Sequence, residues 1–404
     1  MTSNSETSKL PQGSPEHDPA SNTNEEPGKP HLEEDRGETS DGEGLLSVDS
    51  QDDDSAIADL SLPCVLPRYS VKLPLKWIVA YNLLLADAPR RRCDRVFMIT
   101  LRRMGGHTTD IKKAVSLNNS DEEEVEIADT SCIEYVMPND EREQERLDMQ
   151  HQLWYMTLHH RLFLAPVSEN PQHVLDIGTG TGIWAIDFAN RYPSAQVIGS
   201  DLSPIQPEFV PANCQFEVED AEDEWTYSQQ FDFIHGRLMI SCFKDPRYVF
   251  EQAFKSLAPG GYFEMQDTDF PMKSVDDTLV GTDLWDWNQY IIEGSAKAGR
   301  PWTRVKEYKK WMEEIGFVDV EEKILQWPLN TWPRDKHLKT LGLWFCHDLS
   351  EGLSSTRAVL TRGLGWSVDK AEAFLVNVRK DVKNRNVHAY VELRIVYGRK
   401  PPRT

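Results

Sequence analysis

Short apolar runs alternate with longer amphipathic stretches along the chain from about residue 172 onward. Short apolar runs bounded by turn residues are typical of buried strands, and apolar positions three or four residues apart are typical of helices. The amphipathic stretches predict helices over 184–190 and 246–257. The runs predict five strands in chain order: Val174–Ile177, Gln196–Asp201, Cys214–Val218, Phe231–His235 and Tyr262–Gln266. This alternation indicates an α/β fold with a doubly wound, mostly parallel sheet of the Rossmann-like type.

The pattern becomes more helical after the fifth predicted strand. An aromatic helix is predicted over Leu284–Ile292, and a second helix over Arg304–Ile315 ends at Gly316. Strands over Phe317–Gln326 and Val387–Tyr397, with helices between them, complete the chain. Because the aromatic helix follows the fifth strand, we expect it to form a wall or lid over a site at the strand ends.

The N-terminal segment has a different composition. Its first 54 residues carry 15 acidic side chains against three basic ones, and they are rich in Ser, Pro and Gly. Such a segment cannot bury enough apolar surface to offset the entropy lost on ordering. We therefore predict a disordered acidic tail over residues 1–58, followed by an uncertain segment over 59–130 and a folded domain over 131–404.

The uncertain segment changes the sign of its charge. Between Cys64 and Lys113 there are 11 basic and three acidic residues, and Asp121–Glu124 then reverse the sign. A basic cluster such as Arg90–Arg92 fits a docking segment or a nuclear import patch. The composition also fits a poorly structured linker, or residues that are not native coding sequence, such as intron-derived ones. These three interpretations stay open.

Charge and cysteine content narrow the functional classes. The chain has 404 residues, a formal net charge of −22 and a mean hydropathy of −0.55. Nucleic-acid binders are typically basic, so direct nucleic-acid binding is not expected. The six cysteines form no C-x-x-C pair, which argues against a zinc site or a disulfide scaffold, and no metal is expected. The N-terminus lacks signal-peptide features and there is no apolar run of about 18 residues. We therefore expect no membrane association and a soluble location in the nucleus or cytoplasm, not secretion.

The first predicted strand runs into glycines at alternate positions, and a helix follows. A strand, a glycine turn and a helix N-terminus together form a nucleotide-binding corner. The dinucleotide pattern G-x-G-x-x-G would need a glycine at position 183, which holds Ile183. The acidic Asp176 before the turn suits a ligand that has an ammonium group and no phosphate, which favours S-adenosylmethionine (SAM). The candidate cofactor-binding residues of this corner are Asp176, Gly178, Thr179, Gly180 and Gly182.

Two further acidic residues follow the next two strands. Asp201 ends the second strand, 23 residues after Gly178, where ribose hydroxyls are bound in this class of fold. The alternative for Asp201 is a turn or helix cap before Ser203-Pro204. Asp220 and Ala221 follow the third strand, where a carboxylate and the backbone could bind the adenine ring. The alternative for Asp220 is a solvated turn.

Methyl transfer in such a site depends on alignment and on the exclusion of water. The sulfonium of SAM is a good leaving group, so a general base is needed only when the nucleophile is protonated. The candidates for that base are His235, Glu264 and Tyr290. His235 and Arg237 lie at the end of the fourth strand, where ligands bind. A packed, structural histidine is the alternative for His235.

A helix is also predicted ahead of the glycine corner. Pro138–Glu143 opens it, Asn139 or Asp140 can cap it, and acidic residues occupy its first turn. Its apolar face includes Leu147, Leu153, Leu158 and Leu162. We expect this helix to pack beside the corner and to cover it.

The order of these motifs resembles the class I SAM-dependent methyltransferases from about Gln172 to the C-terminus. A narrower resemblance, to the LaeA-like methyltransferases of filamentous fungi, begins at Met137. It rests on Met137–Asp148, Arg161–Pro166, Gly182–Asp187 and Asp201–Pro207. The family resemblance implies a nuclear regulator of secondary metabolism that works with velvet-domain proteins. It does not imply a settled substrate.

Three functional hypotheses follow. The first is a SAM-dependent methyltransferase that acts on an unknown protein or small-molecule acceptor and is linked to the regulation of secondary metabolism. The second is a SAM-binding regulatory protein that acts through velvet-type partners with little or no catalysis. The third is a small-molecule O-methyltransferase of a biosynthetic cluster, which would need an acceptor pocket lined by Trp285, Trp287 and Tyr290. Core or lid packing is the alternative for these aromatic residues.

Overall fold

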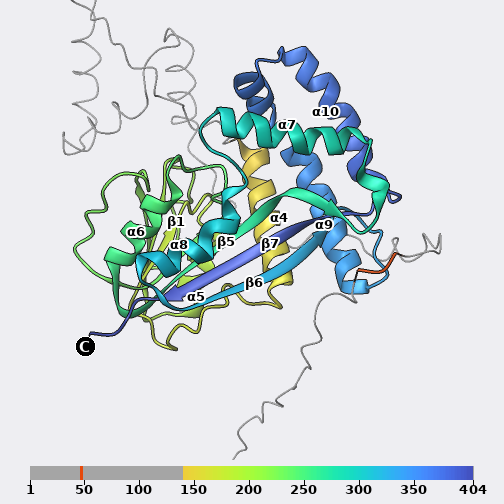
Figure 1. Cartoon of the computed structure of the whole chain (residues 1–404). Helices are drawn as coiled ribbons and strands as arrows, with labels where there is room; N and C mark the ends of the chain where they lie inside the picture. Colours follow the sequence, from red (N-terminus) through yellow and green to blue (C-terminus); the bar gives the residue numbers. More distant parts are fainter. Residues whose placement is uncertain (1–45, 49–139, 404) are drawn as a thin grey trace, which may run out of the picture. The chain divides into compact units, whose positions relative to one another are not determined.

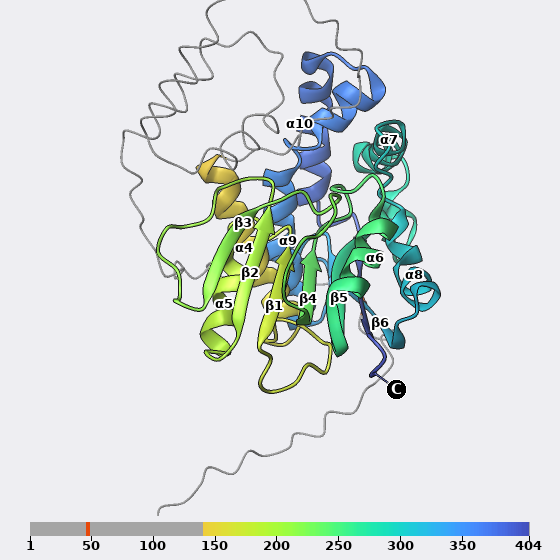
Figure 2. The ribbon, with the colours of Figure 1, turned by 90° about the vertical axis from the view of Figure 1, so that its left-hand side faces the viewer.

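The fold of this protein, described by a computed structural model over residues 46–48 and 140–403, is built on a seven-stranded sheet. The strand order is β3-β2-β1-β4-β5-β7-β6. Strand β7 pairs antiparallel with both β5 and β6 (Figure 1), and strands β1 to β5 pair in parallel (Figure 2). The strands are β1 (His173–Ile177), β2 (Gln196–Asp201), β3 (Cys214–Val218), β4 (Phe231–Arg237), β5 (Leu257–Ser274), β6 (Val318–Pro328) and β7 (Ala389–Arg399). The predicted α/β fold with a mostly parallel sheet is confirmed.

Helices begin where side chains can satisfy their first backbone N–H groups. Asp140 caps α4, because its carboxylate accepts a hydrogen bond from the backbone N–H of Glu143 at 2.9 Å. Asp245 caps α6 through the N–H of Tyr248, and Pro246 occupies the first turn. The helices are α4 (Glu141–Thr157), α5 (Ile183–Arg191), α6 (Pro246–Ser256), α7 (Asp283–Lys297), α8 (Tyr308–Ile315), α9 (Lys336–Gly352) and α10 (Val368–Lys383).

Two hydrophobic cores lie on opposite faces of the parallel strands. Val174 of β1 belongs to the core that contains Phe188 of α5. The next residue, Leu175, belongs to the core formed with Phe250 of α6 and Met312 of α8. Successive side chains of a strand point to opposite faces, so a strand covered on both faces is apolar at every position. Figure 2 shows the helices on both sides of the sheet. The doubly wound arrangement follows from this two-sided burial.

A third hydrophobic core, the helical core, joins α4, α7, α9 and α10 to the extended ends of β5 and β7. Trp154 of α4 packs edge-on against Trp327, with ring centroids 4.9 Å apart. Trp287 of α7 is only 1 % exposed, and its indole N–H donates a hydrogen bond to the hydroxyl of Thr356. The aromatic residues of α7 therefore build this core, as the packing alternative predicted.

Strand β5 is far longer than its predicted span of Tyr262–Gln266. It continues to Ser274 because β7 runs antiparallel beside it, with Asp267 opposite Arg394 and Lys273 opposite Tyr390. Strand β4 also extends two residues beyond the prediction, and α7 is longer at its C-terminal end than predicted. These extensions depend on partners that are distant in sequence.

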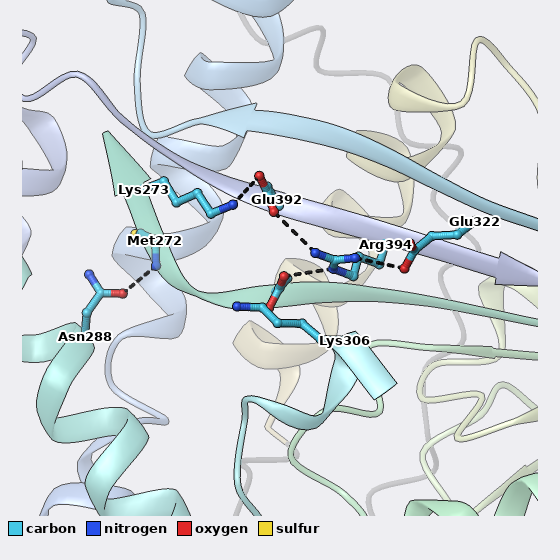
Figure 3. A network of polar contacts seen from close by, with 8 residues as sticks. Met272, Lys273, Asn288, Lys306, Glu322, Glu392 and Arg394 are labelled. Atoms are coloured by element: carbon cyan, nitrogen blue, oxygen red, sulfur yellow. Dashed lines mark hydrogen bonds and ion pairs between the residues drawn. The ribbon is translucent and has the colours of Figure 1, made fainter. Parts of the chain in front are cut away.

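A network of charged side chains ties the antiparallel strands together (Figure 3). The guanidinium of Arg394 on β7 donates to Asp269 of β5 at 2.8 Å and to Glu322 of β6 at 2.9 Å. Lys273 of β5 pairs with Glu392 of β7 at 2.5 Å. Because Asp269 is only 2 % exposed, its charge needs the guanidinium of Arg394 as a partner. The network thus links all three strands at one level.

One short part of the predicted acidic tail lies within the described residues. Val48 forms an isolated antiparallel bridge with Pro333, and the carbonyl of Ser47 accepts a hydrogen bond from the N–H of Arg334 at 2.9 Å. The rest of the predicted tail and the whole 59–130 segment lie outside the described residues, so their predicted character stays a prediction. No helix within 46–48 and 140–403 is long and apolar enough to cross a membrane.

Candidate active site

The glycine turn between β1 and α5 has the backbone geometry that its sequence predicts. Gly178, Gly180 and Gly182 have φ angles of 62°, 58° and 81°. Residues other than glycine rarely adopt this left-handed backbone conformation. A Cβ at Gly178 would lie 2.3 Å from the sulfur of Met239, and a Cβ at Gly182 would lie 2.3 Å from the ring of Phe216. The turn therefore needs glycine both for its conformation and for its close contacts.

Asp176 is held by two side chains at the end of β1. One of its carboxylate oxygens accepts a hydrogen bond from the hydroxyl of Thr179 at 2.6 Å, and the other lies 2.7 Å from Nδ1 of His235. Burial lowers the pKa of His235, so its imidazole is neutral and donates Nδ1–H to Asp176. The His235 ring also stacks on Trp184, with centroids 3.9 Å apart and an interplanar angle of 3°.

This arrangement gives His235 a positioning role. The side chain is fully buried, and its Nδ1 proton is committed to Asp176. It therefore orients the carboxylate at the pocket wall, which agrees with the packed-histidine alternative. Its role as a catalytic base stays a prediction.

Asp201 braces the glycine turn from the end of β2. Its carboxylate accepts hydrogen bonds from the backbone N–H groups of Gly180 and Ser203, both at 2.8 Å. Burial raises the pKa of Asp201, whereas these hydrogen bonds act in the opposite direction. Asp220 makes a similar turn contact, because it accepts from the N–H of Glu222 at 2.9 Å. Both acids thus have structural partners and also face the pocket described next.

A pocket that is partly open to solvent lies at the carboxyl ends of the parallel strands. Helix α4 contributes Leu147 and Gln150 to its wall, so the prediction that this helix packs beside the corner is confirmed. The β4–α6 loop adds the apolar Met239 and Phe243. Seven predicted cofactor residues line the pocket: Asp176, Gly178, Thr179, Gly180, Asp201, Asp220 and Ala221. Gly182 instead precedes α5 as its N-cap residue.

The other two candidate bases lie away from this pocket wall. Glu264 is fully buried and accepts hydrogen bonds from the N–H groups of Leu164 at 2.9 Å and Ala165 at 2.6 Å. Tyr290 packs against Trp366 and Phe374, with ring centroids 4.9 and 5.6 Å away. Glu264 therefore anchors the segment after α4, and Tyr290 belongs to the helical core. Within 46–48 and 140–403, no group of His, Cys, Asp and Glu side chains is placed to hold a metal ion.

Sequence reasoning missed a polar chain behind the pocket. His151 of α4 lies with Nε2 3.0 Å from a carboxylate oxygen of Asp187 and with Nδ1 2.9 Å from the guanidinium of Arg237. Arginine can only donate, so Nδ1 of His151 is the acceptor and its Nε2–H donates to Asp187. Burial lowers the pKa of His151, which keeps this tautomer neutral. No sequence signal joins residues 36 and 86 positions apart.

Comparison with known proteins agrees with this site. A family profile described as "Methyltransferase domain" matches residues 149–322. "Probable methyltransferase tdiE" of Emericella nidulans is 41 % identical over 64 % of this chain and 82 % of its own length. "Methyltransferase pytC" of Aspergillus terreus is 36 % identical over 66 % and 83 %, and "Secondary metabolism regulator LAE1" of Cochliobolus heterostrophus is 35 % identical over 66 % and 90 %.

Solved methyltransferase structures are similar to this chain at low identity. A putative methyltransferase from Bacillus halodurans is 17 % identical, with a TM-score of 0.37 over 62 % of this chain and 98 % of that chain. Phosphoethanolamine N-methyltransferase 2 from Haemonchus contortus, solved in complex with SAM, is 17 % identical, with a TM-score of 0.36 over 64 % and 52 %.

The sheet order, the glycine turn and the fungal relatives at 35–41 % identity define a class I SAM-dependent methyltransferase. Within that class, the chain belongs to the LaeA-like family of fungal methyltransferases and secondary-metabolism regulators. It is an enzyme that uses SAM as its methyl donor. The pocket residues fit this cofactor, because acidic and basic side chains, Asp176 and Arg237, share one wall with the glycine turn.

The residues of this chain supply binding, orientation and shielding. SAM brings the methyl group on a sulfonium. The glycine turn allows close approach of a ligand, and Asp201 keeps that turn in place through the N–H of Gly180. Leu147 of α4 and the apolar Met239 and Phe243 give part of the wall an apolar surface, which favours the exclusion of water. The individual roles of Asp176, Asp201 and Asp220 toward the cofactor stay predictions.

Proposed function

We propose that this methyltransferase acts in fungal secondary metabolism and transfers the methyl group of SAM to a protein or small-molecule acceptor. The observation that carries the proposal is the continuity of the pocket lining. Beyond the predicted cofactor residues, its wall continues over Leu147, Met239 and Phe243. This extension supports room for an acceptor beside the cofactor.

Incubation of the full-length protein with methyl-labelled SAM and a fungal lysate tests the proposal. Fractionation of the lysate into protein and small-molecule pools identifies the acceptor class. Gly180→Arg should abolish both the binding of S-adenosylhomocysteine (SAH) and the labelling. Gly180 has φ of 58°, and its Cβ position lies 3.8 Å from Leu147 across the pocket, so a side chain would be strained and would fill the cofactor's space.

Gly260→Arg is the matched control for this experiment. Gly260 also has a positive φ, 87°, but a Cβ there meets no atom within 4 Å, and it lies outside the pocket lining. It should keep SAH binding and labelling. If Gly180→Arg bound SAH as tightly as wild type, the assignment of the glycine turn to cofactor binding would be contradicted.

The second candidate is a SAM-binding regulator that acts through partners with little or no catalysis. It is supported by relatives such as "Secondary metabolism regulator laeA" of Monascus pilosus, 36 % identical over 66 % of this chain and 74 % of its own length. The partners proposed from the family resemblance are velvet-type proteins. Their capture from the same lysate by tagged protein, without any labelled product, would favour this candidate over the first.

The proposed location is the nucleus or the cytoplasm. The support is the family resemblance. A fluorescent fusion expressed in fungal hyphae measures the location directly. Accumulation of the fusion in the culture medium would contradict the proposal.

A further inference from the structure

Arg237 is a partly buried cation, and no carboxylate among the described residues forms an ion pair with it. It ends β4 and lines the pocket, and the hydrogen bond to His151 at 2.9 Å is its polar contact. Arg146, another partly buried arginine, is by contrast paired with two carboxylates. Its guanidinium pairs with Glu143 at 2.7 Å and with Asp348 at 2.6 Å. A poorly solvated guanidinium without an anion is unfavourable, so Arg237 is suited to a negatively charged ligand.

The His151 contact leaves most of the guanidinium available. Arginine carries five N–H donors, and one points to the neutral Nδ1 of His151. Asp187, on the other side of His151, holds that ring in place at 3.0 Å. The chain from Asp187 through His151 therefore orients the guanidinium without neutralising it. Because Arg237 lines the pocket, its remaining N–H donors are available to a ligand there.

The strand order indicates which part of SAM would lie beside Arg237. Asp220 follows β3 and Asp201 ends β2, which are the predicted adenine and ribose positions. The next strands in the sheet are β1 and β4, so the amino-acid end of SAM extends toward them. Asp176 of β1 lies opposite His235 of β4 in the register, two residues before Arg237. An anion and a cation on adjacent strands match the ammonium and carboxylate of an amino acid.

We propose that Arg237 binds the α-carboxylate of SAM, with His151 and Asp187 as its positioning residues. This inference rests on SAM as the cofactor. The matched pair of charges favours the cofactor over an anionic acceptor, because the same zwitterion carries both complementary groups. An anionic acceptor is an outcome that the test below distinguishes.

Isothermal titration of the full-length protein with SAH and with its decarboxylated analogue tests the proposal. The wild type should bind SAH about 10- to 100-fold more tightly than the analogue, the range expected for charge-assisted hydrogen bonds. Arg237→Met should lose this preference, and it should bind the analogue within about threefold of wild type. Arg237→Lys should keep part of the preference, because it retains the charge but not the planar donor array.

Arg247→Met is the control, since Arg247 lies outside the pocket lining and pairs with Glu314 on the surface. It should keep the full preference. Equal binding of the two ligands by the wild type would overturn the proposal, whether or not the variants fold. Retention of the preference by Arg237→Met would also overturn the proposal. The guanidinium would then bind the acceptor or stabilise the fold. A wild type that binds neither ligand would contradict SAM binding itself.

Discussion

At the scale of single residues, Glu264 shows how burial changes a carboxyl group in this sheet. It is fully buried and receives hydrogen bonds from Leu164, Ala165 and Gln266. Burial outweighs these hydrogen bonds and raises its pKa to about 7. The folded protein therefore keeps a proton on Glu264 at pH values where the unfolded chain has lost it.

The sign of the resulting pH dependence follows from linkage. A raised pKa in the folded state means that the contribution of Glu264 to stability is largest below its unfolded pKa of 4.5 and is lost as the pH rises toward about 7. Glu264→Gln removes the ionisable group. Its free energy of unfolding relative to wild type should therefore increase by about 1–3 kcal/mol between pH 5 and pH 7.5.

Urea denaturation of wild type and Glu264→Gln at the two pH values measures this difference. Asp267 has a similarly raised pKa of about 7, so it contributes in the same direction to both proteins and cancels in the comparison. The lowered pKa values of His151 and His235 act in the opposite direction and cancel likewise. A difference that does not vary with pH would show that Glu264 is ionised at both values.

At the scale of elements, α4 joins the cofactor pocket to the helical core. Its middle contributes Leu147 to the pocket wall, and Trp154 in its last turn packs in the third core. A buried ion pair between Arg146 of α4 and Asp348 of α9, at 2.6 Å, connects the two helices. Asp348→Ala should lower the free energy of unfolding by about 2–4 kcal/mol, because it leaves Arg146 with one anion in a poorly solvated place.

The same helix pair offers a matched control. Arg142 and Glu351 also join α4 to α9, but the Arg142 side chain is 79 % exposed. Glu351→Ala should therefore cost no more than about 1 kcal/mol. Denaturant titrations of both variants provide the measurement. Equal losses for the two variants would contradict the distinction between buried and exposed pairs.

Packing in the helical core also determines whether the aromatic helix α7 is a lid over the site or part of the core. Its sequence suits a lid as well as a core, because an aromatic face has the same spacing in both settings. Trp287 is buried against Phe270, and Tyr290 contacts Trp366 and Phe374. The partners of Tyr290 come from a segment far along the chain, so local periodicity could not choose between the two settings.

At the scale of the whole molecule, the cofactor pocket is confined to one stretch of the chain. Among the described residues, its lining lies entirely between Leu147 and Phe243. Deletion of residues 1–45 should therefore leave SAH affinity within about twofold of wild type, since distant sites with no shared partners act additively. Isothermal titration measures the affinity. A tenfold loss would show that the acidic segment takes part in cofactor binding.

Local sequence was enough to predict the corner and its acids. The glycine spacing, the strand ends at Asp176 and Asp201, and the Asp220-Ala221 pair all come from short-range patterns. The carboxyl ends of neighbouring parallel strands share one edge, so chain order alone brings these residues to one pocket. The five parallel strands were predictable for the same reason, because burial on both faces leaves a continuous apolar run.

Contacts between distant segments determined the rest. His151, Asp187 and Arg237 meet because α4 packs against α5 and the end of β4, and nothing in their spacing signals this contact. Glu264 anchors Leu164, and β7 lengthens β5, through partners about 100 or more residues away. Periodicity reports which face of an element is buried, whereas the partner across that face is set by packing of the whole chain. The glycine turn and its acids are thus readable from sequence, and the charged wall that completes the pocket is a product of tertiary structure.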